Sequence, residues 1–237
     1  MKRLWDVVIS AVLLALLAPL LLLLAGVNWV LTRRTFFRQV RLGRGLRPFV
    51  IWKFQTMVDG PSDASTVTTR GDRRLTPFGR LLRATKLDEL PQLVNVLRGE
   101  MSLVGPRALT PNEIDRVPAD VARAVYAARP GMTGLAAVAF ADEERILGTA
   151  SDPEAFYFQA VLPQKMALEL AYVRRRGWWL DLLILAATPL TIILPGPTRR
   201  YLLRRAGAPR SIPSPPREGA PSAERGIGDE TLPMTRP

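Results

Sequence analysis

The sequence of 237 residues contains neither histidine nor cysteine. Without cysteine the chain forms no disulfide, holds no zinc through thiolates and carries no thiol nucleophile. Without histidine it lacks the commonest general base and the commonest transition-metal ligand. We therefore expect any metal ion bound by this protein to be a hard cation held by oxygen atoms, with magnesium as the first expectation.

Positive charge is in excess, with a formal net charge of +12. The segment 206–237 has as many acidic residues as arginines, so the excess lies within residues 1–205. A surface of this sign attracts nucleic acid, anionic lipid headgroups or phosphorylated substrates. Arginine greatly outnumbers lysine, and genome composition is a competing explanation for that bias.

An uncharged apolar run covers residues 7–31 and is long enough, as a helix, to cross the hydrocarbon core of a bilayer. Its length disfavours a secretory signal peptide. Pro19 lies at its centre, and basic residues flank both ends, which places both ends in the cytoplasm under the positive-inside rule. A hairpin that turns at Pro19 and returns is slightly favoured over a kinked spanning helix.

The remaining chain reads as a mixture of short strands and helices. Strands are expected in 36–43 and 47–57, and a loop is expected over 61–72. Helices and turns are expected as follows: a helix over 76–87, a helix from Pro91 to a stop at Gly99, a helix from Ala119, a turn over 129–134, and a helix over 151–176 that is capped by Ser151 or Asp152 and interrupted near Pro163.

A second apolar stretch spans 177–196, carries Asp181 and is expected to break at Pro189. Trp178 and Trp179 follow three arginines, a pattern typical of a helix lying in the membrane interface. A second spanning helix is the alternative. The segment 206–237 holds seven prolines and few large apolar side chains, which predicts a disordered tail.

Two adjacent carboxylates, Asp88 and Glu89, precede Pro91 within "RATKLDELPQLVNVLRGEMSLVGPR". A residue before proline avoids the helical region, so Leu90 is expected to be extended and the pair to sit at a helix N-terminus. Phosphate suits that place if magnesium and arginines neutralise the carboxylates. An aspartate in such surroundings is a known nucleophile toward phosphorus, but on the chemistry alone simple helix capping is the favoured explanation of the pair.

Several ordered motifs then point to one family. They are "KRLWDVVIS", "FFRQVRLG", "WKFQTM", "LTPFGRLLRATKLDELPQLVNVLRGEMSLVGPR", "RPGMTGL" and "YVRRRGWWLDLLIL", and together they cover residues 2 to about 192. In these motifs the chain resembles the bacterial sugar transferases of the small monotopic phosphoglycosyl transferase family. The long central block is the most specific part of the resemblance.

The resemblance implies transfer of a sugar phosphate from a UDP-sugar to undecaprenyl phosphate, with release of UMP, at the start of a bacterial surface glycan. It implies that Asp88 is the nucleophile and binds Mg²⁺, and that Glu89 assists and shares the metal. Substrate-binding roles are implied for the following residues: Lys53, Arg83, Arg107, Arg129, Pro130, Gly131, Thr133 and Gly134.

The fold implied by the resemblance is α+β, mostly helical and monotopic. Residues 1–32 would form a re-entrant membrane hairpin kinked at Pro19, and residues 33–205 a catalytic domain on the cytoplasmic face of the inner membrane, with an interfacial helix over 177–196. Residues 206–237 would form the tail. Membrane lipids are the expected partners, nucleic acid is not expected, and homo-oligomerisation is left open.

The chain departs from the family pattern at three places. Ala18 replaces the usual serine before the kink proline, Gln55 replaces an arginine, and Ala136-Ala137 replaces an aromatic residue and a glutamine. These changes remove a hydroxyl, a cation and polar pocket groups. They leave an inactive assembly platform as an alternative to an active enzyme. The positive charge and the apolar N-terminal run leave a membrane-anchored basic binding module as another.

Overall fold

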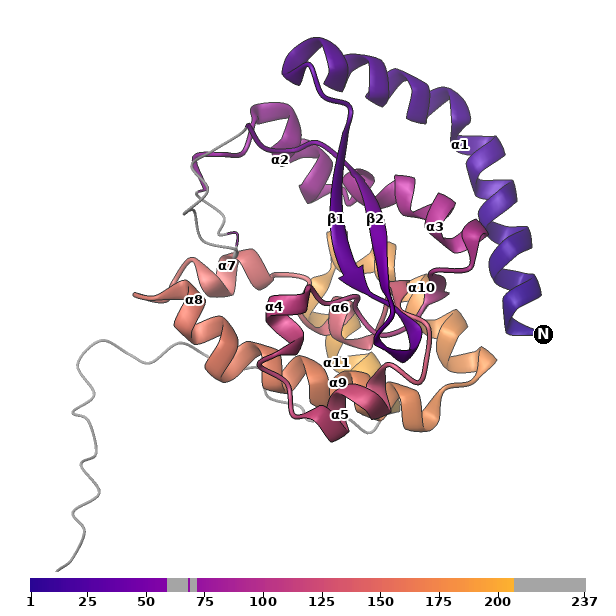
Figure 1. Ribbon diagram of the computed structural model, residues 1–237, viewed down its shortest axis with the longest axis vertical. Coiled ribbons are helices and arrows are strands. Elements are labelled where there is room, and N and C mark those ends of the chain that lie inside the picture. The colour runs from indigo at the N-terminus through magenta and orange to yellow at the C-terminus, as the bar shows by residue number, and fades with distance from the viewer. Residues whose placement is uncertain (59–67, 69–71, 207–237) are drawn as a thin grey trace, which may run out of the picture.

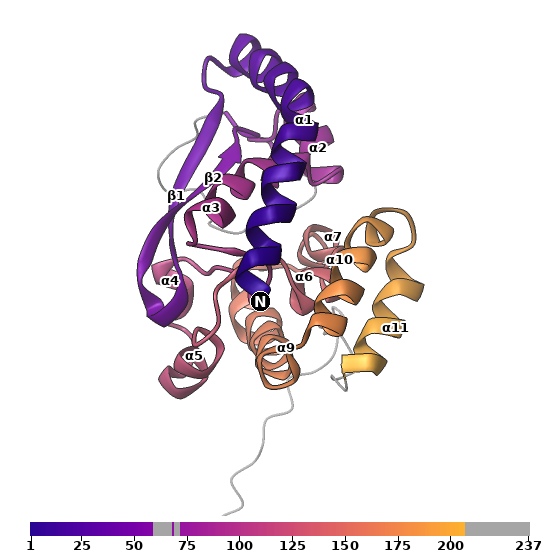
Figure 2. The same ribbon diagram turned by 90° about the vertical axis from the view of Figure 1, so that its right-hand side faces the viewer.

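The computed structural model describes residues 1–58, 68 and 72–206. A long apolar helix stands beside a body of shorter helices with two small sheets, so the predicted mostly helical α+β class is confirmed (Figures 1 and 2). Most of the predicted loop over 61–72 and nearly all of the predicted tail lie outside the described residues.

The first sheet is the antiparallel hairpin of β1 (Phe36–Leu42) and β2 (Pro48–Phe54), which confirms the two predicted strands. A short 3₁₀ turn (Arg44–Leu46) joins them, and Gly45 has a φ of 67° there, a conformation that favours glycine. In this register Arg41 pairs with Phe49, and Phe37 with Lys53. Since side chains alternate along a strand, Arg41 and Lys53 share one face of the hairpin.

Helix α2 (Pro77–Ala84) starts at Thr76, whose Oγ accepts a hydrogen bond of 2.8 Å from the backbone N–H of Gly79. A 3₁₀ turn (Leu87–Gln92) follows, and α3 (Leu93–Arg98) ends where Gly99 takes a φ of 85°. The stop at Gly99 is confirmed, but the expected helix start at Pro91 is wrong. Leu90 and Pro91 both lie inside the 3₁₀ turn, so the expectation of an extended Leu90 is also wrong, and the turn continues directly into α3.

The second sheet is parallel and contains β3 (Ser102–Val104) and β4 (Gly131–Thr133). The two backbones touch, because a Cβ added at Gly131 would lie 2.0 Å from the backbone nitrogen of Gly105. The turn expected over 129–134 is therefore replaced by a strand at its centre. Along the chain, α4 (Pro111–Ile114) and α5 (Ala119–Val125) come between β3 and β4, and α5 begins at Ala119 as predicted. Helix α6 (Leu135–Ala139) follows β4.

The C-terminal part consists of further helices, whose bounds are α7 (Glu143–Leu147), α8 (Pro153–Phe156), a π turn (Tyr157–Val161), α9 (Leu162–Arg175), α10 (Trp178–Ile193) and α11 (Pro195–Ala206). Asp152 caps α8, and the π turn forms the expected interruption just before Pro163. The break expected at Pro189 is wrong: α10 continues through it, because buried contacts of Ile184 and Ala187 anchor the helix.

The main hydrophobic core gathers around α9, on which α5, α6 and α11 pack (Figure 2). Leu162, Met166 and Tyr172 of α9 are buried in it. Helix α11, which the sequence motifs do not indicate, buries Leu202 and Leu203 in the same core. The C-terminal helices therefore support α6, which lines the cavity described below.

Helix α1 (Lys2–Thr32) contains Pro19 and bends near its middle (Figure 1). Among the described helices it alone is long and apolar enough to cross a membrane. Asp6 near its start is buried: its carboxylate accepts hydrogen bonds from the Ser102 Oγ at 2.9 Å and the Leu103 N–H at 3.1 Å. In its second half, Leu24 packs with Phe54 and Leu82. Both halves of α1 therefore contact the same body.

Replacing Asp6 with alanine is expected to destabilise the protein by about 1–3 kcal/mol, because the Ser102 hydroxyl and the Leu103 N–H then lose their acceptor in a buried place. Chemical unfolding in detergent, followed by circular dichroism, measures the loss. The control is Asp115→Ala, which removes an exposed carboxylate. Equal stability of the two variants would refute the anchoring role of Asp6.

Candidate active site

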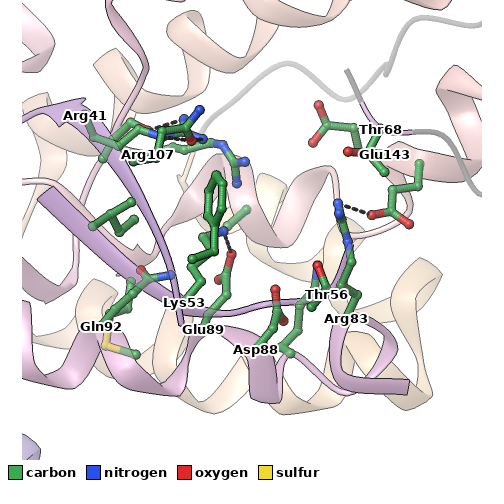
Figure 3. Close-up of a pocket in the computed structure, with 18 of the residues that line it drawn as sticks. Arg41, Lys53, Thr56, Thr68, Arg83, Asp88, Glu89, Gln92, Arg107 and Glu143 are labelled. Atoms are coloured by element: carbon green, nitrogen blue, oxygen red, sulfur yellow. Dashed lines mark hydrogen bonds and ion pairs between the residues drawn. The ribbon is translucent and has the colours of Figure 1, made fainter. Parts of the chain in front are cut away.

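A cavity of about 2200 Å³ opens between the β1–β2 hairpin, the 3₁₀ turn before α3, and helices α6, α7 and α9 (Figure 3). It is lined by most of the residues predicted to act on substrate: Lys53, Arg83, Asp88, Glu89, Arg107, Gly131, Thr133 and Gly134. Arg129 and Pro130 lie outside the lining. Segments far apart in the chain thus bring the predicted charged residues into one cavity.

Asp88 and Glu89 come from the 3₁₀ turn and both point into the cavity (Figure 3). The two carboxylates have different partners. Glu89 Oε1 accepts a hydrogen bond of 2.6 Å from Lys53 Nζ of strand β2. Asp88 is buried, and its Oδ1 has no hydrogen-bond partner among the described residues. One carboxylate is therefore held by a cation, and the other is available for a ligand.

The electrostatic surroundings separate the two acids. Burial, reinforced by the neighbouring Glu89 charge, raises the pKa of Asp88 to about 6. Burial alone would raise the pKa of Glu89 too, but Lys53 and Arg107 outweigh it and lower that pKa to about 2. Near neutral pH Glu89 is fully ionised, while Asp88 still gains from any cation that approaches its unpaired oxygen.

Arg107 follows strand β3 and its main chain is held on both sides. Its N–H donates to Glu169 Oε1 at 3.0 Å, and its carbonyl accepts from the Tyr126 hydroxyl at 2.6 Å. The Arg107 side chain lines the cavity, and its buried Nε has no hydrogen-bond partner among the described residues. An arginine with an anchored main chain and an unpaired Nε donor suits an anionic ligand such as phosphate.

Arg83, the other predicted phosphate-binding arginine, has a partner in the structure. One of its terminal nitrogens lies 2.6 Å from Glu144 Oε1 of α7 (Figure 3). Binding of a phosphate by Arg83 would therefore compete with Glu144. The ion pair also joins α2 to α7 across the cavity.

Further charged residues of the cavity were not predicted. Arg41 lies 3.1 Å from Glu113, which also accepts from the Tyr157 hydroxyl at 2.6 Å. Lys165 lies 2.5 Å from Glu143.

The sequence carried one unused signal for this part of the cavity. Lys165 and Glu169 are four residues apart and fall on the apolar stripe of α9 that includes Leu162, Met166 and Tyr172. Charged residues on a buried stripe indicate a polar site, because burial of a charge is costly unless it has a partner.

The structure shows the surroundings of two of the three positions at which the chain departs from the family pattern. Gln55 is buried, and its Nε2 donates to the Met57 carbonyl at 2.6 Å. Ala136 and Ala137 line the cavity at α6 without offering a polar side-chain group. The cavity therefore loses polar contacts on the α6 side and keeps them on α7 and α9.

Asp88 and Glu89, which we call the dyad, meet some of the requirements of a magnesium site. Among the described residues no group of three or more carboxylates gathers around one point. Asp88, however, offers a buried oxygen without a partner, with Glu89 next to it. Magnesium often binds one or two carboxylates and completes its coordination with water and substrate phosphates, and this donor set suits that mode.

A protein-family model described as bacterial sugar transferase matches residues 1–195. The chain belongs to the bacterial sugar transferase family. The resemblance drawn from the motifs is thereby confirmed, and the match includes α1, Asp88, Glu89 and the whole of α10.

Similar proteins are known in several bacteria. This sugar transferase is 44% identical over 195 residues to a UDP-glucose:undecaprenyl-phosphate glucose-1-phosphate transferase of Caulobacter vibrioides, covering 79% of the chain and 67% of that protein. It is 36% identical over 191 residues to a protein of the same description in Klebsiella pneumoniae, covering 79% and 39%. It is 33% identical over 195 residues to the uncharacterized sugar transferase EpsL of Bacillus subtilis, covering 82% and 88%.

The matched lengths differ among these relatives. The chain spans about two thirds of the Caulobacter protein and about two fifths of the Klebsiella protein, but most of EpsL.

The stability of this sugar transferase is expected to depend on pH through Glu169. Burial raises the pKa of Glu169 from 4.5 to about 7. The folded protein thus keeps a proton that the unfolded chain releases, so this residue's contribution to stability falls as the pH rises from about 4.5 to about 7. In Glu169→Gln this fall is absent, and the unfolding midpoint should drop less between pH 5 and pH 8 than in the wild type.

Urea unfolding at the two pH values measures this difference. The control is Asp120→Asn, which neutralises an exposed carboxylate and should keep the wild-type dependence. If Glu169→Gln also keeps it, the buried acid does not exchange its proton on unfolding.

Proposed function

We propose that this sugar transferase moves a sugar 1-phosphate from a UDP-sugar to undecaprenyl phosphate and releases UMP. The names of the Caulobacter and Klebsiella relatives, which state this reaction for glucose 1-phosphate, support the proposal. They also make UDP-glucose the first donor to test. The product, an undecaprenyl diphosphate sugar, would begin a bacterial surface glycan.

The observation that carries the proposal is the state of Asp88 in the cavity. Its carboxylate is buried, lacks a partner at Oδ1 and faces a cavity whose walls hold Lys53 and Arg107. A carboxylate oxygen without a hydrogen bond keeps its lone pairs for a ligand or for attack. Basic groups around it attract the phosphates of both substrates and offset the negative charge that otherwise repels an acid from phosphorus.

In the proposed mechanism the Asp88 carboxylate attacks the phosphorus that carries the sugar. The bond from that phosphorus to the bridging oxygen breaks, and UMP leaves with the oxygen. An oxygen of undecaprenyl phosphate then attacks the same phosphorus and displaces Asp88. The lipid diphosphate sugar results, and the carboxylate is restored.

Neighbouring groups have supporting roles in this proposal. Lys53 holds Glu89 ionised, and Glu89 in turn favours attraction of the cation that accompanies the donor. Arg107 binds a phosphate oxygen through its guanidinium, whose Nε has no partner among the described residues. Magnesium, held by Asp88 and Glu89, would supply charge neutralisation for the diphosphate. A variant mechanism has Asp88 only hold the metal while the lipid phosphate attacks directly.

We also place the protein on one leaflet of the inner membrane, with the cavity on the cytoplasmic side. The packing of α1 supports this, because contacts at Asp6 and at Leu24 hold both halves against one body. A helix that crosses the bilayer would carry one half away from that body. Exposed Trp178 and Trp179, whose rings stack at 3.9 Å, support an interfacial position of α10.

Asp88→Asn is expected to lower turnover by about 10⁴-fold or more, since an amide is neither a nucleophile toward phosphorus nor a good magnesium ligand. UMP release by detergent-solubilised protein, with undecaprenyl phosphate, magnesium and UDP-glucose, measures the effect. A panel of other UDP-sugars would identify the preferred donor.

The matched control for this experiment is Asp115→Asn, an isosteric change at an exposed aspartate. It should retain wild-type turnover. Near-normal turnover of Asp88→Asn would rule out both the covalent role and the metal-binding role of this residue.

The topology of α1 is testable because the chain has no cysteine. Single cysteines at Leu4 and Arg33, both exposed, mark the two ends of α1. In inside-out membrane vesicles a membrane-impermeant maleimide should label both. Labelling of Arg33→Cys alone, with Leu4→Cys reacting only from the opposite side, would indicate a spanning helix.

A further inference from the structure

A second charged cluster lies in the cavity, away from the dyad. It consists of Glu143 of α7 and Lys165 of α9, together with the rings of Phe140 and Tyr157, and we call it the α7–α9 cluster. The Lys165 Nζ lies 2.5 Å from Glu143 Oε1, 5.1 Å from the Tyr157 ring centroid and 5.7 Å from that of Phe140. All four residues line the cavity.

Arg107 connects this cluster to the dyad. Glu143 and Glu89 both act on its charge, yet no ion pair within 4.0 Å joins Arg107 to either carboxylate among the described residues. The guanidinium is therefore near enough to both acidic groups to be influenced by their charges, and it is paired with neither of them. A ligand whose phosphates engage Arg107 would extend toward Asp88 on one side and toward the α7–α9 cluster on the other.

The α7–α9 cluster has spare hydrogen-bonding capacity. Glu143 uses one carboxylate oxygen for Lys165, and its other oxygen has no hydrogen bond to a described residue, while 22% of its side chain stays exposed to the cavity. Lys165 is only 3% exposed in its side chain, yet it has three donors and one carboxylate partner. An ion pair of this kind adds little net stability to a core, so a ligand-binding role accounts better for its position.

The chemistry of the pair matches two neighbouring hydroxyl groups. One hydroxyl donates to the free Glu143 oxygen while the next accepts from Lys165, and the aromatic rings pack against the C–H face of a sugar ring. A nucleoside diphosphate sugar carries such vicinal hydroxyls on both its ribose and its hexose. Its diphosphate links the two rings, so a donor whose phosphates engage Arg107 can bring one of the rings to the α7–α9 cluster.

We propose that Glu143 and Lys165 form a subsite that binds vicinal hydroxyls of the nucleotide-sugar donor and so determines donor specificity. The inference rests on the proposed function for the identity of the donor. The subsite also offsets the absence of polar side chains at Ala136 and Ala137, which face the same cavity.

The test combines variants with donors that lack one hydroxyl. Glu143→Gln, Lys165→Met and the double variant remove the charges, and the double variant leaves no unpaired buried charge if a single one fails to fold. The donors are UDP-glucose, UDP-glucose lacking the ribose 2′-hydroxyl, and UDP-2-deoxyglucose. Binding is measured by calorimetry and turnover by UMP release.

Wild-type protein is expected to bind one of the deoxy donors about tenfold or more weakly than UDP-glucose, consistent with loss of a hydrogen bond to a charged group. In the folded double variant that discrimination should vanish. Loss of discrimination at the ribose assigns the subsite to the nucleoside, and loss at the hexose assigns it to the sugar. A general loss of affinity with unchanged discrimination would overturn the proposal.

The matched control is Asp120→Asn combined with Arg123→Met, which neutralises two exposed charges on α5 and should leave discrimination unchanged. UMP release tests the proposed function, and calorimetry tests the subsite independently of it. If the wild type releases no UMP, the reaction is wrong, while the calorimetric comparison of the three donors still decides whether the subsite exists.

Discussion

The close contact of two short parallel strands is the constraint on which the rest of the structure depends. Gly105 and Gly131 let the ends of β3 and β4 approach until their backbones touch, and a side chain at either position would separate them. Helix α1 is anchored on β3 through Asp6, and Arg107 leaves β3 directly into the cavity. Helix α6 continues from β4 as part of the cavity wall. Helix α1, Arg107 and the cavity wall at α6 are therefore all positioned by these two strands.

The cavity beside these strands gives two acidic residues that are adjacent in the sequence different surroundings. Glu89 is held by Lys53, whereas Asp88 is buried with an unpaired oxygen, so two adjacent acids have different chemistry. Hydrogen bonds to Glu169 and Tyr126 hold the main chain of Arg107 in place. They fix the point from which its side chain extends. Such fixed groups need little rearrangement when a charged substrate binds, and this is the condition under which electrostatic stabilisation is most effective. The absence of histidine is therefore no obstacle to phosphoryl chemistry here.

Local patterns predicted the fold where local interactions decide it. The strands β1 and β2, the Asp152 cap and the stop at Gly99 follow from the strand composition, from N-cap preference and from left-handed glycine geometry. The motif resemblance likewise named many of the residues that line the cavity, although Arg129 and Pro130 lie outside it. The pairing of Ser102 with Gly131 could not be predicted from the sequence. Strands of three residues are too short to show a periodic pattern, and the two strands are far apart in the chain. Helix α11 and the partnership of Lys165 with Glu143 depend on packing between distant segments, which a single sequence does not reveal.

The most direct test of the central claim is the mass of the intact protein after incubation with UDP-glucose and magnesium but without lipid acceptor. The account predicts UMP in an amount equal to the active protein and a mass increase of one hexose phosphate, located on the peptide that contains Asp88. Addition of undecaprenyl phosphate should remove the adduct. UMP release that requires the acceptor, from a protein that never gains mass, would contradict a covalent role for Asp88 and indicate direct transfer between the two substrates.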